Sequence, residues 1–249
     1  MILRRAAEHL RQQHWTAFAI ELVIVVLGVF IGLQVSNWNE ARKDRSLEAV
    51  YLANIASDIR GDSREMDEII RVSALRMAVL NRLLWSDRAR PMPAGFASAR
   101  GFIGIEPVPA YADDDRDSPG IALFILSTLD GNRSAYDTVI NTGGIGLIRD
   151  TRTLRKIQDY YASVDKALHF EVGLEQNRDK LVDVERRLGI SPADPMTADE
   201  LAAVLDANPE FRATAENYWL YTNRHLKLMH DLQREAKALA DALQPGGSP

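Results

Sequence analysis

The chain of 249 residues contains no cysteine. This absence excludes disulfide scaffolds, thiol catalysis, thiolate zinc sites and lipid attachment to cysteine. The redox compartment stays open, because a cysteine-free chain suits either side of a bacterial membrane.

The sequence also lacks a concentrated stripe of lysine and arginine. Residues 1–45 hold six basic and four acidic residues, which leaves 24 basic and 31 acidic residues in the rest of the chain, a net charge of −7. An acidic domain of this kind is a poor electrostatic partner for a phosphate backbone. We therefore expect no nucleic-acid partner.

One long apolar run is present at residues 17–36, in which Glu21 is the only charged residue. Twenty helical residues measure about 30 Å, the hydrocarbon thickness of a bilayer. Trp15 and Trp38 bracket the run, where indole rings commonly lie at the two headgroup levels. A cleavable signal peptide would need a shorter apolar region and a small-residue cleavage site, and a soluble core helix would show a polar face. The run therefore predicts a transmembrane helix that contacts the lipid bilayer.

The flanks of this helix carry three basic residues each, so the positive-inside rule does not fix its orientation. These residues are Arg4, Arg5 and Arg11 on one side and Arg42, Lys43 and Arg45 on the other. A short basic tail before an uncleaved apolar segment usually stays in the cytoplasm. We therefore expect residues 1–16 in the cytoplasm, a single span in the bacterial inner membrane, and the large domain in the periplasm.

One face of the predicted membrane helix carries both its small residues and its only charge. Glu21, Gly28 and Val35 are seven residues apart, so they project within about 20° of one line, and Gly32 lies about 40° from it. Glycines four residues apart permit close approach of membrane helices, and an unpaired carboxylate in an apolar region is costly. We expect this face to contact a second copy or another membrane protein. In the alternative, Glu21 only reaches the interface and the glycines are incidental.

The stretch from Glu21 to Asp44 ends its apolar part in a Leu-Gln-x-x-Asn-Trp-Asn-Glu pattern. The matching residues are Leu33, Gln34, Asn37, Trp38, Asn39 and Glu40. This stretch resembles the N-terminal signature of the DUF6090-like family, bacterial membrane proteins of unknown function. A second stretch, residues 134–161, is similar to the family's later pattern, with Tyr136, Gly143, Leu147, Ile148, Asp150, Leu154, Tyr160 and Tyr161 in place. The resemblance implies a one-helix anchor with a helical domain, and it implies no activity.

After the membrane run, apolar residues at helical spacing predict long helices at about 44–86 and 150–188. Three polar residues interrupt the apolar stripe of the first, which favours a bundle helix over a strict coiled coil. These residues are Asp62, Ser73 and Arg76. Asp150 is placed to cap the second helix.

Shorter elements and breaks separate these helices. Dense proline and glycine predict an irregular loop at about 86–120, and an apolar helix or buried segment follows at 121–129. A further helix, from Asn132 or Ser134 through Asn141, is expected to stop at Gly143.

The C-terminal part also shows clear helix signals. A capping box from Thr197 to Glu200 opens a short helix, and Pro209 stands in the first turn of the last one. Residues 245–249 form a disordered tail by composition. The predicted class is therefore all-α, an N-terminal transmembrane helix followed by a long-helix bundle domain at 37–244.

No motif in the domain predicts a chemical site over a structural role. The aspartate run at 113–117 lacks the glycine and the glutamate of a calcium loop. His225 and His230 lie about 140° apart on a helix, so they do not chelate one ion. The glycines from Gly143 to Gly146 lack the preceding strand and the lysine of a phosphate loop. We expect no enzyme activity, no cofactor and no metal.

The aromatic residues of the two last long helices allow two interpretations, a ligand pocket or the core, and the core is favoured. These residues are Tyr160, Tyr161, Tyr218, Trp219 and Tyr221. The leading functional expectation is a membrane-anchored helical interaction or scaffold module. The alternative is an extracytoplasmic sensor that binds a small molecule between its long helices and acts through a membrane partner.

Overall fold

The computed structural model describes residues 15–85, 90–98, 101–112 and 118–244, apart from the side chains of residues 16, 17 and 98. The predicted tail at 245–249, the aspartate run at 113–117 and most of the predicted cytoplasmic tail lie outside the described residues. Helices account for 78% of the described residues and strands for almost none, which confirms the predicted all-α class.

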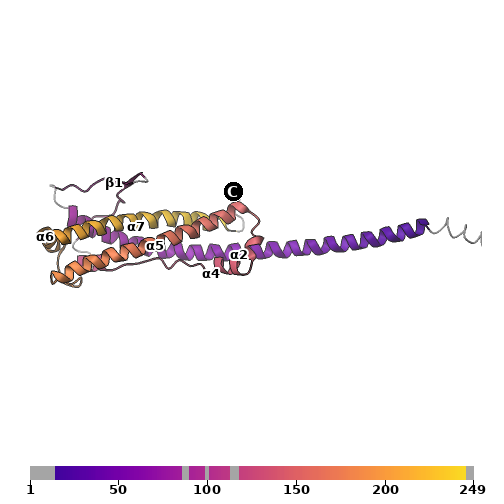
Figure 1. Ribbon diagram of the computed structural model, residues 1–249, viewed down its shortest axis with the longest axis horizontal. Coiled ribbons are helices and arrows are strands. Elements are labelled where there is room, and N and C mark those ends of the chain that lie inside the picture. The colour runs from indigo at the N-terminus through magenta and orange to yellow at the C-terminus, as the bar shows by residue number, and fades with distance from the viewer. Residues whose placement is uncertain (1–14, 86–89, 99–100, 113–117, 245–249) are drawn as a thin grey trace, which may run out of the picture. The chain divides into compact units, whose positions relative to one another are not determined.

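The first helix, α2 (Trp15–Trp85), is continuous over 71 residues. It contains no proline and only three glycines, so nothing in its sequence forces a break. The chain divides into two compact units, residues 1–50 and 51–249. We call them the N-terminal unit and the bundle unit (Figure 1). The first part of α2 belongs to one unit and the second part to the other.

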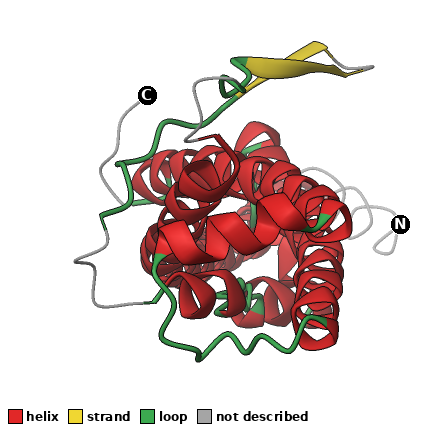
Figure 2. Cartoon of the chain, turned by 90° about the vertical axis from the view of Figure 1, so that its left-hand side faces the viewer, coloured by secondary structure: helices red, strands yellow, loops and turns green. Residues whose placement is uncertain are grey.

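In the bundle unit, the second part of α2 packs with α5 (Thr151–Arg187) and α7 (Pro209–Ala242). Figure 2 shows these helices clustered together and seen nearly end-on. Hydrogen bonds join positions 60 to 240, 67 to 233, 73 to 225 and 81 to 219. Because numbers rise on α2 as they fall on α7, the two helices run antiparallel and in one register.

The helix starts that the sequence predicts are confirmed. The Asp150 carboxylate accepts the backbone N–H groups of Arg152 (3.0 Å) and Thr153 (3.2 Å) at the start of α5. Thr197 and Glu200 form the reciprocal capping box of α6 (Ala198–Ala207). These caps satisfy amide groups that have no partner inside a helix.

Three short helices lie between α2 and α5 in the described part of the sequence. They are α3 (Pro119–Phe124), α4 (Ser134–Asn141) and the 3-10 helix η1 (Gly144–Leu147). Gly143 separates the last two with a φ of 72°, a left-handed conformation that favours glycine. The predicted stop after Asn141 is therefore confirmed.

Residues 86–120 contain more regular structure than the proline and glycine content indicates. Strands β1 (Gly95–Ser98) and β2 (Gly101–Gly104) pair antiparallel, and Figure 2 shows them outside the cluster of helices. The following apolar segment is helical only as far as Phe124. Ile125 closes the helix with its N–H on the Ile121 carbonyl but is itself extended, with φ −67° and ψ 124°, so residues 126–133 continue along α2 outside any helix.

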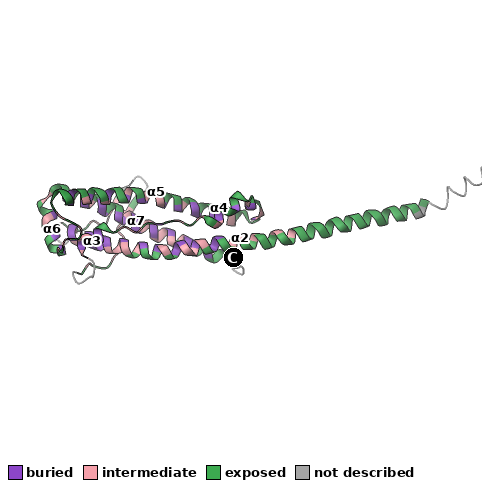
Figure 3. Cartoon of the chain, turned by 90° about the horizontal axis from the view of Figure 1, so that it is seen from below, coloured by how far each residue is buried: buried purple, intermediate pink, exposed green. Residues whose placement is uncertain are grey.

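The core of the bundle unit is formed by the apolar faces of the long helices. In Figure 3, buried residues line the inside of the bundle, whereas the N-terminal part of α2 is exposed. Tyr160, Tyr161, Tyr218 and Trp219 are all buried, which confirms the core interpretation for these four aromatic residues. Tyr221 is 37% exposed and stacks on Phe170 instead.

Candidate functional site

The apolar part of α2 is exposed on every face. Among the described residues, α2 is the one helix long and apolar enough to cross a membrane, and none of its most apolar window is buried. Large side chains such as Leu22, Leu27 and Val35 are 51–60% exposed. Exposed apolar surface on this scale indicates contact with lipid or another protein.

The residues of the predicted helix contact face lie on this exposed surface. Glu21 and Val35 are exposed, and a Cβ added at Gly28 or Gly32 would meet no atom within 4 Å. The face is therefore open to a neighbour. Whether a neighbour binds there stays a prediction.

The predicted interface tryptophans are also exposed, Trp15 by 69% and Trp38 by 61%. The Arg42 guanidinium lies 6.0 Å from the centre of the Trp38 ring. Among the family-motif residues, Leu33, Gln34, Asn37, Asn39 and Glu40 share the exposure of Trp38.

A row of carboxylates in the bundle unit binds backbone amides of residues 129–135, which connect α3 to α4 and begin α4. Asp58, Asp62 and Glu65 of α2 accept the backbone N–H groups of Ala135 (2.8 Å), Asn132 (2.9 Å) and Asp130 (2.9 Å) in turn. Glu171 of α5 accepts the Leu129 N–H at both oxygens, at 3.1 and 3.2 Å. We call these four side chains the carboxylate clamp. They satisfy the amides of Leu129, Asp130 and Asn132, which lie outside any helix or sheet, and the Ala135 amide in the first turn of α4.

Burial raises the pKa of two carboxyl groups of the carboxylate clamp. Asp62 is 2% exposed, and loss of solvent raises its pKa, although the Asn132 amide and the Tyr160 hydroxyl oppose the shift. The Tyr160 hydroxyl donates to Asp62 at 2.7 Å, and burial raises the pKa of Tyr160 far above its usual range. Burial also raises the pKa of Glu65.

Three buried groups form a hydrogen-bonded relay that joins all three long helices. Nδ1 of His225 (α7) lies 3.1 Å from Oγ of Ser73 (α2), and Nε2 lies 2.9 Å from Oε1 of Glu171 (α5). Glu171 accepts in its other contacts, so we assign the ring proton to Nε2, and Nδ1 then accepts from Ser73. Burial lowers the pKa of His225, which favours the neutral ring.

This serine, histidine and glutamate sequence has the connectivity of a nucleophile–base–acid triad. Ser73 and His225 are both fully buried, so they are out of reach of a substrate in this structure. The relay therefore acts by satisfying polar groups in the core.

Arg76 and Glu185 are two further charged residues in the core. Arg76 has no exposed surface, and its Nη2 donates to the Ile125 carbonyl at 2.8 Å beside the Tyr218 ring. Its Nε and Nη1 have no hydrogen-bond partner. Glu185 is 2% exposed, and burial raises its pKa to about 7.

A second segment, residues 104–106, is fastened to α7 by side chains. Asn223 accepts the Glu106 N–H at 2.8 Å and donates to the Gly104 carbonyl at 3.1 Å. The Glu106 carboxylate lies 3.1 Å from Nδ1 of His230 and 3.4 Å from Nζ of Lys227. His225 and His230 thus contact different elements, as their angular separation on the helix indicates.

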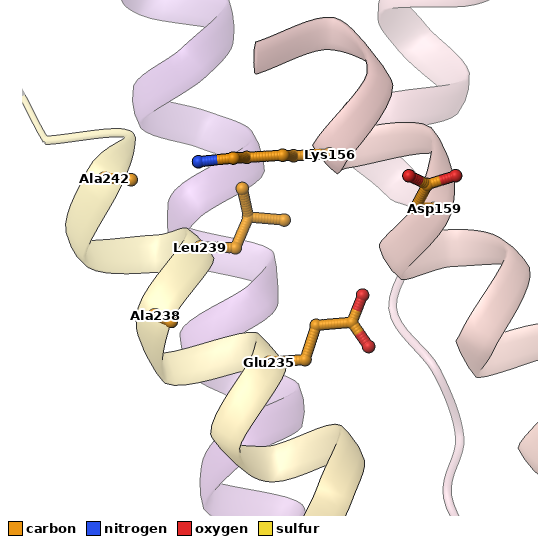
Figure 4. A pocket seen from close by; sticks show the side chains of 6 residues that line it. All are labelled: Lys156, Asp159, Glu235, Ala238, Leu239 and Ala242. Carbon is orange, nitrogen blue, oxygen red and sulfur yellow. The ribbon is translucent and has the colours of Figure 1, made fainter. Parts of the chain in front are cut away.

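Among the described residues of the bundle unit, depressions lie between several pairs of helices, and three of them are described in turn. One of about 270 Å³ joins α5 and α7, where Figure 4 shows Lys156 extending over Leu239 with the carboxylates of Asp159 and Glu235 nearby. A second, of about 310 Å³, lies between α2 and α4 and is mostly polar. The third and largest, of about 580 Å³, lies between α2 and α7. We call it the α2–α7 groove.

The described residues contain no group of three or more His, Cys, Asp or Glu side chains able to hold a metal ion. The sequence did indicate the buried polar groups, because Asp62, Ser73 and Arg76 interrupt the apolar stripe of α2. It did not identify their partners, which lie 49–152 residues away along the chain.

Comparison with known proteins gives a match to a family model. The model of a family of unknown function, DUF6090, matches residues 21–88, which include the apolar run and the Leu-Gln-x-x-Asn-Trp-Asn-Glu motif. The match does not extend to residues 134–161, the second stretch of the predicted resemblance. No curated protein and no solved structure matches the chain. The match over residues 21–88 supports membership of the chain in the DUF6090 family of unknown function.

Proposed function

We propose that this protein is a membrane-anchored helical module that acts by binding other proteins. The observation that carries the proposal is the exposed apolar surface of α2 over residues 18–35. A bilayer removes such a surface from water at about 25 cal/mol per Å². The bundle unit then contributes a helical surface for a protein partner.

Partner binding in the membrane is proposed for the face of Glu21, Gly28, Gly32 and Val35. Because a Cβ added at Gly28 or Gly32 would meet no atom of the described residues within 4 Å, a second helix can approach their backbone closely. The partner is a second copy or another membrane protein. We propose no catalysis and no cofactor.

Membrane fractionation of the full chain tests the anchor. We expect the protein to stay with membranes after alkaline carbonate washing and to leave them only in detergent. Val26→Lys with Leu27→Lys places two charges at the centre of the span, each costing about 2.5–3.5 kcal/mol, and should release the protein. Ser46→Lys with Ala49→Lys is the matched control on the same helix. Equal release of both variants, or wild type in the soluble fraction, contradicts the proposal.

Location is part of the proposal. We place the span in a bacterial inner membrane with the bundle unit on the periplasmic side. A reporter active only outside the cytoplasm, fused after Pro249, should be active. An inactive but well-expressed reporter reverses the orientation.

A second function, small-molecule sensing, is favoured by the α2–α7 groove. The groove lies between two long helices, and the helix that forms one wall continues into the apolar run. A ligand bound there would contact the same helix that enters the membrane.

A further inference from the structure

The α2–α7 groove combines size with an unusual set of charges. Its volume of about 580 Å³ is within the range of small-molecule sites. Its charged lining consists of three basic and two acidic side chains. They are Arg60, Arg64, Lys237, Asp67 and Asp241.

About half of the described arginines form an ion pair with a carboxylate, and the two arginines of the groove are among those that form none. Elsewhere, arginines pair with carboxylates, as Arg82 does with Asp199 and Arg187 with Glu210, both at 2.5 Å. Among the described residues, no ion pair is found for Arg60, Arg64 or Lys237. In an acidic domain, three such cations around one groove require an explanation.

Backbone carbonyls position the two arginines. Nη2 of Arg60 donates to the Ala240 carbonyl of α7 at 3.2 Å, and Nε of Arg64 donates to the Arg60 carbonyl at 3.3 Å. These bonds leave most of the guanidinium N–H groups open. Arg60 and Arg64 are four residues apart on one helix, a spacing at which like charges repel each other. A bound anion would offset that repulsion.

Lys237 faces the arginines from the opposite helix. It lies between position 233, which bonds to Asp67, and position 240, which bonds to Arg60. Because the helices are antiparallel, Lys237 is level with Ser63, the neighbour of Arg64 in the chain. The Asp67 carboxylate is held by the Gln233 amide at 2.6 Å, one turn away from this level.

We propose that the α2–α7 groove binds a small molecule through a phosphate group or paired carboxylates. Guanidinium groups bind such oxygens with two parallel hydrogen bonds, and lysine adds a point charge. Ser57 and Ser63 line the same groove and contribute neutral donors. The other two depressions do not fit this ligand, since one has a single cation with two carboxylates and the other has only Asp58 as a charged residue.

The proposed anion is the ligand class of the sensing function proposed above. Its binding does not depend on the membrane anchor. Failure of the anchor would appear in membrane fractionation, whereas failure of this site appears only in binding.

Calorimetric titration of the full chain in detergent micelles tests the site, with inorganic pyrophosphate and citrate as probes. Sodium chloride at equal ionic strength is the reference. We expect saturable binding of at least one probe and a matching rise in the unfolding temperature. Arg64→Gln and Lys237→Gln should each weaken binding at least tenfold. Arg155→Gln removes an exposed arginine of α5 and should leave binding unchanged.

The source of the anion is resolved by repeating the titration in nanodiscs. If phosphatidylglycerol discs lower the apparent affinity for the probe and phosphatidylcholine discs do not, a lipid headgroup occupies the same site. Equal affinity in both assigns the site to a free metabolite. No saturable binding above the chloride reference, unchanged binding in Arg64→Gln and Lys237→Gln, or an equal loss in Arg155→Gln would overturn the proposal.

Discussion

The bundle unit buries charged groups in its core, whereas the N-terminal unit exposes apolar side chains on all sides. In the bundle unit, Asp62, Arg76 and Glu171 are at most 4% exposed. In the N-terminal unit, Val25 and Ile31 are about 60% exposed. Each arrangement would be costly in the surroundings that suit the other. Charged groups would be costly in hydrocarbon, and exposed apolar side chains would be costly in water.

The two parts of α2 therefore differ in which side chains they expose and which they bury. The early part of α2 has a solvent-facing surface that suits hydrocarbon. The later part has an inner face whose polar residues find partners on other elements.

Glu171 is the residue whose loss should harm the bundle unit most. Glu171→Ala leaves the Leu129 amide and Nε2 of His225 buried without an acceptor. We expect the free energy of unfolding to fall by about 3–5 kcal/mol. Glu175→Ala, on the exposed face of the same helix, should have a small effect. Chemical unfolding of both variants in detergent gives the comparison, and similar losses would argue against the clamp.

Glu185 should make stability depend on pH. Its folded pKa of about 7 exceeds the ordinary value of 4.5, so the folded chain binds the proton more tightly than the unfolded chain. Stability therefore rises as pH falls from about 8 to about 5, by at most about 3 kcal/mol. Glu185→Gln should be more stable than wild type at pH 8 and nearly equal at pH 5.

His225 has the opposite sign, because burial holds its folded pKa below 6.5 and stability is lost as the unfolded chain takes up protons in acid. The difference between wild type and Glu185→Gln cancels this contribution. A difference that does not change between pH 5 and pH 8 would refute the prediction.

Gly120 tests how tightly α3 packs against Pro192. A Cβ at this position would lie 2.4 Å from the Pro192 carbonyl oxygen, and backbone cannot move as a side chain does. Gly120→Ala should cost about 1–3 kcal/mol in thermal unfolding. Gly104→Ala, where an added Cβ meets nothing within 4 Å, should be nearly neutral. Equal effects would mean that the close approach is not maintained.

Substitutions in the contact face of the apolar segment should change a free energy least, in this case the free energy of helix association. Gly28→Ile with Gly32→Ile should weaken helix association by about 1 kcal/mol, and Glu21→Ala should weaken it further. A membrane two-hybrid assay at equal membrane levels measures the loss. Unchanged association in both variants would leave the segment as a plain anchor.

Much of the fold follows from local sequence. Asp150, the capping box at Thr197 and Gly143 mark helix ends, because their side chains or backbone conformation act within a few residues. The apolar run at 17–36 is equally local. These features are therefore predictable without knowledge of the rest of the chain.

The polar interior is not local. Glu171 and His225 are 54 residues apart, and Ser73 is a further 98 residues from Glu171 along the chain, so their meeting depends on the register of α2, α5 and α7. The same register brings Lys237 to the groove that Arg64 lines. Sequence spacing within one helix cannot predict such contacts. The pairing of β1 with β2 was not predicted either, because glycine and proline indicate turns without indicating pairing.

The absence of cysteine permits a direct test of the membrane assignment. Single cysteines at Val26 and Ser46 would be the only thiols in their chains, and both positions are exposed on α2. In membrane vesicles opened by sonication, a membrane-impermeant maleimide should label the Ser46 position and should label the Val26 position only after detergent is added. Equal labelling of both positions before detergent would contradict the claim that residues 17–36 lie in the bilayer.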